Sequence, residues 1–452
     1  MLKDVRHLAY LGLATTSLAG AVVAVAMTAM AADDSNNKDQ DNNRNAPVSL
    51  LSVIKVPGNP VTSADISWAD PVTERYYFAD RSNFGVEVID AEKDVWVGRV
   101  KGMAGPLPSG GGTSTTNGPG PNGVVVTPLK RLWAGDGNST VQLADVDPDS
   151  KTYLQILRSV STALPACDGG TATTHYCGRA DEIDYDPKHH IILVANNAPL
   201  SVTVPHLSID PYATFINADP PYNVLGRITF PGAGGLEQPR WDHQTQRFLI
   251  TVPGKMIGTT ITTLPSIHVI NPTTTLSEKT YPLDCNAIAG VTSVSVTGIV
   301  LRPNQHILVS ACGFPIILTL DKQTSKVNII KVINQVGGGD QVWFNPGDGR
   351  FYVTGLDKTT PTGVQSLGVI NAETSEWLQN VPDVRGKNPA AFSENNHIFT
   401  IVQITAAIAA GTAPDDSICF TAFNVKGTGC VAVFRHSGGK ADDGADEGKA
   451  DR

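Results

Sequence analysis

The feature that most constrains the fold is an internal repeat that occurs seven times. Each unit has a polar residue, a short apolar segment, a turn six positions after that polar residue, and a second apolar segment. Successive units start 43 to 60 residues apart. The residues that open the units are Asp65, Asn122, Asp181, Glu237, Thr297, Asp340 and Asn388. A single unit of this size cannot bury both faces of a sheet, so neighbouring units are expected to stack.

Most units continue with a third and a fourth short apolar segment, as in RYYFAD, VEVID and WVGRV of the first unit. The chain also contains 43 Gly and 30 Pro, which is too many turn formers for long helices. Four short strands at this period are typical of a β-propeller, in which each small antiparallel sheet packs between two others. The sequence therefore predicts an all-β fold, a seven-bladed β-propeller of four-stranded antiparallel blades, over residues 48–436.

The two ends of the repeat region predict how the ring closes. The last unit has no fourth strand after the segment from Cys430 to Phe434, whereas Val48 to Val56 precedes the first unit without a partner. A strand with an unpaired edge invites association, and pairing these two segments would remove that edge. We therefore expect the N-terminal strand to complete the last blade.

The N-terminal sequence has the pattern of an export signal. Two basic residues precede an apolar run from Leu8 to Met30, which ends in a small-x-small cleavage motif. We predict a signal peptide of residues 1–31, and the length of the run leaves an uncleaved membrane anchor as the alternative. A flexible polar linker (32–47) and a disordered acidic tail (437–452) flank the propeller. The expected location is the periplasm or the exterior of a bacterium, with no membrane span after cleavage.

The charged residues and the cysteines exclude several classes of function. The chain has 34 basic and 43 acidic residues and no basic run, so we expect no nucleic-acid partner. It lacks CxxC and CxxCH motifs, which argues against thioredoxin-like chemistry and c-type haem. We expect the protein to bind neither haem nor a nucleotide. We also expect it to be a monomer. An even number of cysteines fits an oxidising compartment. Pairing of near neighbours predicts the disulfides Cys167 with Cys177, Cys285 with Cys312, and Cys419 with Cys430.

The opening residues of the seven units predict a site in the channel. The innermost strands of a propeller line its axis, so residues at one repeat position form a ring. All seven carry a side-chain oxygen and four are carboxylates, which repel one another unless they are protonated or neutralised by a cation. Ca²⁺ takes six to eight such oxygens. The predicted ligands are Asp65, Asn122, Asp181, Glu237, Asp340 and Asn388. The alternative is a hydrated polar ring without metal.

Two segments resemble known propellers. The units GPNGVVVTPLKRLWAGD and ERYYFADRSNFGVEVID resemble the YVTN type of repeat, which is found in secreted and periplasmic bacterial proteins. The segment LEQPRWDHQTQRFLIT resembles the Glu-Gly-Pro-x-Trp motif of gluconolactonase and senescence-marker-type propellers. Those proteins are calcium-dependent hydrolases with six blades and a metal at the channel centre, and the present sequence departs from their motif at Gln238. The second resemblance implies a calcium-dependent hydrolase.

Two functions of different classes therefore remain open. In the first, Ca²⁺ polarises an oxygen of a lactone, ester or phosphoester, and Asp340 and Glu237 are the catalytic carboxylates that activate water or attack. In the second, the propeller is a non-catalytic exported platform whose loops bind a protein, a glycan or a small ligand. Both place a small-molecule or extracellular ligand at the channel face.

Overall fold

The computed structural model describes residues 46–105, 120–137, 139–164, 179–197, 210–303 and 306–436. The chain divides into two units, residues 1–41 and 42–452, and all described residues lie in the second. The predicted signal peptide, almost all of the predicted linker, the acidic tail and the pair Cys167 and Cys177 lie outside the described residues.

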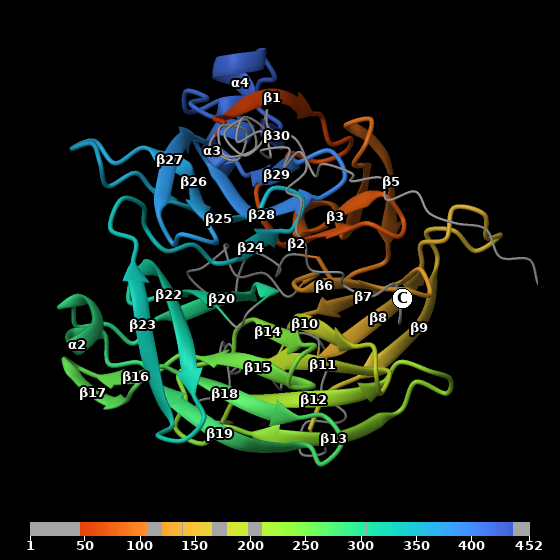
Figure 1. Ribbon diagram of the computed structural model, residues 1–452. Coiled ribbons are helices and arrows are strands. Elements are labelled where there is room, and N and C mark those ends of the chain that lie inside the picture. The colour runs from red at the N-terminus through yellow and green to blue at the C-terminus, as the bar shows by residue number, and fades with distance from the viewer. Residues whose placement is uncertain are drawn as a thin grey trace, which may run out of the picture. The chain divides into compact units, whose positions relative to one another are not determined.

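Seven four-stranded antiparallel sheets form a ring of blades (Figure 1). Blades one to three are β2 (Ala64–Asp70), β3 (Arg75–Asp80), β4 (Gly85–Asp90), β5 (Val95–Lys101); β6 (Val124–Thr127), β7 (Arg131–Asp136), β8 (Thr140–Asp145), β9 (Ile156–Ser161); and β10 (Ala180–Asp186), β11 (Ile191–Asn196), β12 (Tyr212–Asn217), β13 (Val224–Thr229). Blades four and five are β14 (Pro239–Asp242), β15 (Arg247–Val252), β18 (Ser266–Asn271), β19 (Leu276–Pro282); and β20 (Val296–Leu301), β21 (Ile307–Ala311), β22 (Phe314–Asp321), β23 (Lys326–Val332). Blades six and seven are β24 (Val342–Asn345), β25 (Arg350–Leu356), β26 (Gln365–Asn371), β27 (Trp377–Pro382); and β28 (Gly386–Phe392), β29 (His397–Val402), β30 (Cys430–His436) with β1 (Val48–Ile54).

The first strand of each blade lies innermost, and these strands contact their neighbours all the way round, from β2 through β6, β10, β14, β20 and β24 to β28 and back to β2. The second strands are buried along nearly their whole length, because both faces of a blade pack against other blades. The apolar cores therefore lie between blades. Tyr76 of β3, for example, stacks on Phe399 of β29 in the neighbouring blade, with ring centroids 4.8 Å apart.

The ring closes as the sequence predicted. Strand β1 pairs antiparallel with β30, from Val48 opposite His436 to Ile54 opposite Val431. The side chain of Gln379 on the neighbouring blade holds the start of β1, since its Nε2 donates to the Val48 carbonyl at 2.7 Å and its Oε1 accepts from the Val48 amide at 3.2 Å. The last blade thus contains strands from both ends of the repeat region.

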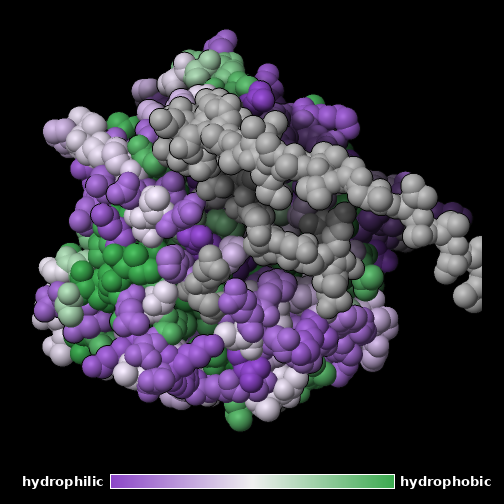
Figure 2. All heavy atoms as spheres, in the orientation of Figure 1, coloured by the Kyte–Doolittle hydropathy of each residue, from purple (hydrophilic) through white to green (hydrophobic). Residues whose placement is uncertain are grey.

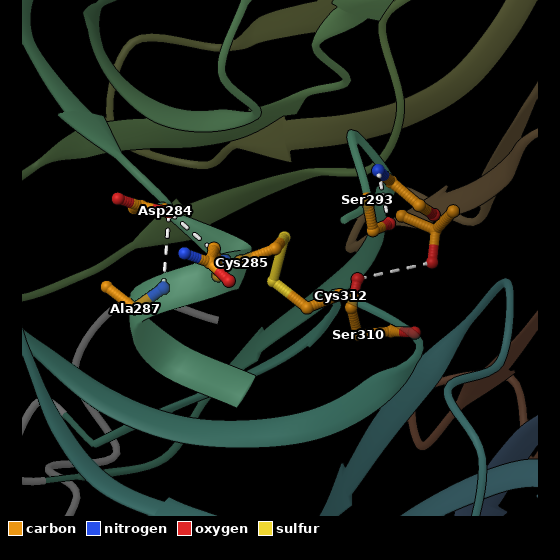
Figure 3. Close-up of a disulfide and its surroundings, with 9 residues drawn as sticks. Asp284, Cys285, Ala287, Ser293, Ser310 and Cys312 are labelled. Atoms are coloured by element: carbon orange, nitrogen blue, oxygen red, sulfur yellow. Dashed lines mark hydrogen bonds between the residues drawn. A yellow bond between two sulfur atoms is a disulfide. The ribbon is translucent and has the colours of Figure 1, made fainter. Parts of the chain in front are cut away.

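Two predicted disulfides are confirmed. Cys285–Cys312 joins the short helix α2 (Cys285–Ala289) to the end of β21 (Figure 3). Cys419–Cys430 joins α4 (Ile418–Phe423) to the start of β30. Every described cysteine is paired.

The blades also carry insertions between their strands. A hairpin of β16 (Lys255–Ile257) and β17 (Thr260–Thr263) interrupts blade four, and α3 (Ala406–Ala409) lies with α4 between β29 and β30. Within the described part of the chain, no helix combines the length and apolar character that a membrane span requires. The face shown in Figure 2 is mainly hydrophilic, with a hydrophobic area where Figure 1 places β22 and β23; β23 carries the exposed Ile329 and Ile330.

Candidate metal centre in the channel

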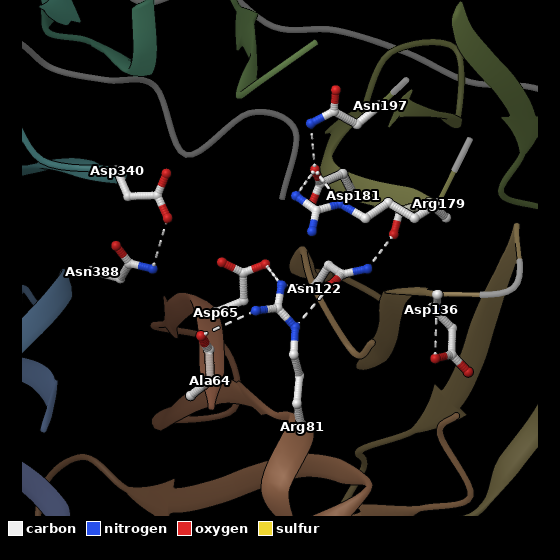
Figure 4. Close-up of polar contacts among 12 residues, drawn as sticks. Ala64, Asp65, Arg81, Asn122, Asp136, Arg179, Asp181, Asn197, Asp340 and Asn388 are labelled. Carbon is white, nitrogen blue, oxygen red and sulfur yellow. Dashed lines mark hydrogen bonds and ion pairs between the residues drawn. The ribbon is translucent and has the colours of Figure 1, made fainter. Parts of the chain in front are cut away.

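The opening residues of the repeats meet at the axis of the ring. Figure 4 shows Asp65, Asn122, Asp181, Asp340 and Asn388 facing a common space, although they come from five different blades. The structure divides this ring into two halves that differ in how the carboxylates are neutralised.

Two arginines occupy one half of the ring. Arg81 begins the short 3₁₀ helix η1 (Arg81–Asn83), which Asp80 caps by accepting a hydrogen bond from the Asn83 amide. The Arg81 guanidinium is 3% exposed and forms an ion pair with Asp65. It also donates to the Asn122 Oδ1 at 2.6 Å. Two predicted ligands, Asp65 and Asn122, therefore bind a buried arginine.

Asn122 and Asp181 have further partners that fix their side chains. The Asn122 Nδ2 donates to the Ala180 carbonyl at 2.7 Å, so both ends of its amide group are engaged. Asp181 Oδ2 accepts hydrogen bonds from Arg179 Nη2 at 2.6 Å and from Asn197 Nδ2 at 3.2 Å. These contacts fix both side chains in the channel wall.

The other half of the ring gathers three carboxylates. One oxygen each from Glu182, Glu237 and Asp340 lies within 4.8 Å of the other two. Glu182 is buried, Glu237 is half-buried and Asp340 is exposed. Glu237 and Asp340 were predicted as ligands from the sequence, and Glu182 was not. The Oε2 of Glu182 is enclosed and makes no hydrogen bond to any described residue.

A β-bulge explains why the sequence pattern missed Glu182. Side chains alternate between the two faces of a regular strand, so in a regular strand Asp181 and Glu182 would point in opposite directions. The pairing of β10 with β11 is irregular between Ala180 and Ile183, and a bulge of this kind redirects side chains. The adjacent acidic pair is the signal in the sequence that could have raised this alternative.

The remaining ring residues serve the wall of the channel. The Asn388 Nδ2 donates to Asp340 Oδ2 at 3.5 Å, and its Oδ1 accepts from the Gln341 amide at 3.3 Å. Thr297 donates its hydroxyl to the Gly339 carbonyl at 2.7 Å. Asn388 thus orients Asp340 from the side, and Thr297 links two neighbouring blades.

The electrostatics agree with this division. Burial raises the pKa of Asp65 to about 6, although the Arg81 guanidinium opposes the rise. Burial raises the pKa of Glu182 well above its ordinary value, and the Glu237 and Asp340 carboxylates raise it further. Burial, Asp340 and Asp181 likewise raise the pKa of Glu237, and Arg179 offsets part of that rise. Negative charge is thus least well compensated where Glu182, Glu237 and Asp340 meet.

Comparison with known proteins supports the fold alone. No family model matches the chain, and no curated protein sequence matches it. The structure is similar to the crystal structure of the Cps50 (Swd1) β-propeller domain of Myceliophteria thermophila, with a TM-score of 0.54 and 9% sequence identity. The match covers 86% of this chain and 99% of that domain. At this identity the likeness establishes the propeller architecture and carries no argument about function.

Proposed function

We propose that the protein is an exported propeller that binds a divalent cation of the calcium class at the channel and uses it to hydrolyse a lactone, ester or phosphoester. The observation that carries the proposal is the carboxylate of Glu182. A buried carboxylate oxygen without a hydrogen-bond partner is costly, and here it lies beside two further carboxylates. A cation would offset that cost for all three groups at once.

The donor set fits calcium. Ca²⁺ prefers hard oxygen ligands at 2.3–2.6 Å, so oxygens on opposite sides of the ion lie about 4.8 Å apart. The separation of the three carboxylate oxygens stays within that limit. Glu182 and Glu237 would hold the cation from the channel wall and Asp340 from the exposed side. Further coordination positions would remain open toward solvent, as a catalytic site requires.

The residues around the cluster suggest separate roles in hydrolysis. A bound cation would polarise a carbonyl or phosphoryl oxygen of the substrate. Asp340 is the best placed to accept a proton from water, because it is the most exposed of the three carboxylates and Asn388 orients it. Glu237, the second predicted catalytic residue, is more enclosed and is better placed to hold the cation.

Export is part of the proposal. The pattern at residues 1–31 suggests secretion, and two disulfides in the described part of the chain are compatible with an oxidising compartment.

Metal analysis followed by activity measurements tests the proposal. Purified protein should contain stoichiometric calcium that a chelator removes, and the loaded protein should hydrolyse members of a panel of lactones, esters and phosphoesters. Glu182→Gln should lose both properties, whereas Glu278→Gln, on an outer strand and paired with Arg247, should keep them. Calcium binding without turnover would favour the binding platform, and the absence of calcium binding would refute the metal site.

A further inference from the structure

A second ring of side chains lies further along the same strands. The fourth position of the repeat is occupied by Trp68, Val125, Asp184, Arg240, Val300, Trp343 and Ala391. Three of these side chains meet although they belong to blades one, four and six. The Arg240 Cζ lies 5.3 Å from the centre of the Trp68 ring and 5.6 Å from that of Trp343. The two indole rings are themselves 5.5 Å apart and nearly perpendicular. The arginine thus packs against both tryptophans, which also contact each other, within the channel.

The guanidinium of Arg240 lacks the partners that a buried arginine normally has. Arg240 is 8% exposed, yet it forms no hydrogen bond and no ion pair with any residue in the described ranges. Asp184, at the same repeat position in the preceding blade, instead accepts a hydrogen bond from the Trp241 amide at 2.5 Å. None of the Arg240 nitrogens is an enclosed atom without a partner, so they face solvent in the channel and leave the five N–H donors of the guanidinium open to a ligand.

Three enclosed donors on or next to the inner strands also lack acceptors among the described residues. The indole Nε1 atoms of Trp68 and Trp343 are enclosed and make no hydrogen bond to a described residue. The same holds for the Nε2 of Gln238, two residues before Arg240, whose Oε1 accepts from the Ile299 amide at 2.8 Å. The unsatisfied groups of Trp68 and Trp343 in this second ring are donors, in contrast to the unsatisfied acceptor of Glu182 in the first.

We infer that Arg240, flanked by Trp68 and Trp343, forms a site in the channel for the oxyanion of a small molecule, a carboxylate or a phosphate. The guanidinium presents its donors as a planar fork that matches two oxygens of such a group. The two tryptophan faces hold the fork by cation–π contacts.

Burial lowers the pKa of the Arg240 guanidinium, and the Asp184 and Glu182 carboxylates oppose that shift.

This site uses other residues than the three carboxylates of the proposed cation site, and its test does not depend on calcium. The full chain is kept in chelator and titrated with inorganic phosphate or with acetate at constant ionic strength, with sodium chloride as the reference. Tryptophan fluorescence and the melting temperature are recorded. A saturable response to phosphate or acetate but not to added chloride is expected, because only oxyanions engage both arms of the fork. Response to one of the two probes identifies the preferred oxyanion.

Variants locate the response in the channel. Arg240→Gln should weaken binding about 10- to 100-fold, the loss expected when hydrogen bonds to a charged group are removed. Arg247→Gln is the matched control in the same blade: its side chain pairs with Glu278 on an outer strand, and it should bind as the wild type does. If Arg240→Gln does not fold, Trp343→Phe serves instead, since it keeps an aromatic ring and removes one N–H donor.

The outcomes decide between this site and a purely structural arginine. The inference fails if the wild type gives no saturable response, or if Arg240→Gln responds as the wild type does. Because oxyanion binding is measured in chelator, a failure of the cation site leaves this inference standing.

Discussion

Replacing one carboxylate in each half of the channel ring distinguishes a cation site from a structural ion-pair network. Glu237→Gln removes a member of the cluster with Glu182 and Asp340, whereas Asp65→Asn removes the partner of the buried Arg81. The two residues share a repeat position and have opposite expected effects. Glu237→Gln should leave the melting temperature in chelator unchanged or slightly higher, because it relieves repulsion. Asp65→Asn should lower it, because a buried guanidinium loses its counter-charge.

The sizes of the two effects can be estimated. A ligand at 100 times its dissociation constant stabilises the folded state by about 2.7 kcal/mol. With an unfolding entropy of about 2.1 cal/mol/K per residue, this stabilisation should raise the melting temperature of a propeller of roughly 390 residues by about 3 °C. Breaking a buried ion pair costs about 3–5 kcal/mol, which corresponds to a loss of about 4 to 6 °C.

Differential scanning calorimetry in chelator and in excess calcium measures both effects. The wild type and Asp65→Asn should each gain about 3 °C with calcium, and Glu237→Gln should gain nothing. Loss of the calcium shift in both variants would mean that the whole ring binds the cation, as the repeat pattern alone suggests. A wild type without any shift would refute the cation site and favour a hydrated polar ring.

Three further predictions concern the fold. A chain that starts at Pro57 lacks β1 and its buried side chains, each worth about 1.5–3 kcal/mol, so thermal unfolding should begin at a lower temperature; an unchanged melting temperature would contradict closure by β1. Replacing both Cys419 and Cys430 by Ser opens a loop with a sequence separation of 11. The free energy of unfolding, measured with denaturant, should fall by about 3 kcal/mol. A wild type whose stability does not change with reductant would argue against the disulfide's role. Burial raises the pKa of Asp383 to about 7, against a smaller opposing effect of Thr400. Because this folded-state pKa lies above that of the unfolded chain, the free energy of unfolding should fall by up to about 4 kcal/mol as the pH rises from about 4 to 7. Asp383→Asn should flatten this dependence of stability on pH. A dependence parallel to that of the wild type would refute the assignment.

The architecture could be predicted from the sequence because it depends on periodic features. Strand length, turn positions and the repeat interval are local properties of the sequence. Seven such repeat units in succession leave few ways to bury both faces of each sheet. The pairing of β1 with β30 followed from counting strands at the two ends of the repeat region. Near-neighbour pairing of cysteines was correct for both described disulfides, because each joins segments that are close in the chain.

The composition of the site was only partly predictable. The repeat identified the ring that contains Glu237 and Asp340, since residues at equivalent positions in a closed ring converge on its axis. It could not show that Asp65 and Asp181 are neutralised, because Arg81 and Arg179 lie outside the aligned position and reach the ring through η1 and the segment before β10.

The sequence by itself thus determined which residues surround the channel, and the tertiary structure decided which of them carry uncompensated charge. Repeat position sets a residue's distance from the axis, and this is a property of the backbone. Compensation of charge depends on side chains that arrive from several blades and on the bulge that redirects Glu182. Electrostatic energy depends on distances of a few ångströms, so a shift of one residue in register changes a structural carboxylate into a candidate ligand.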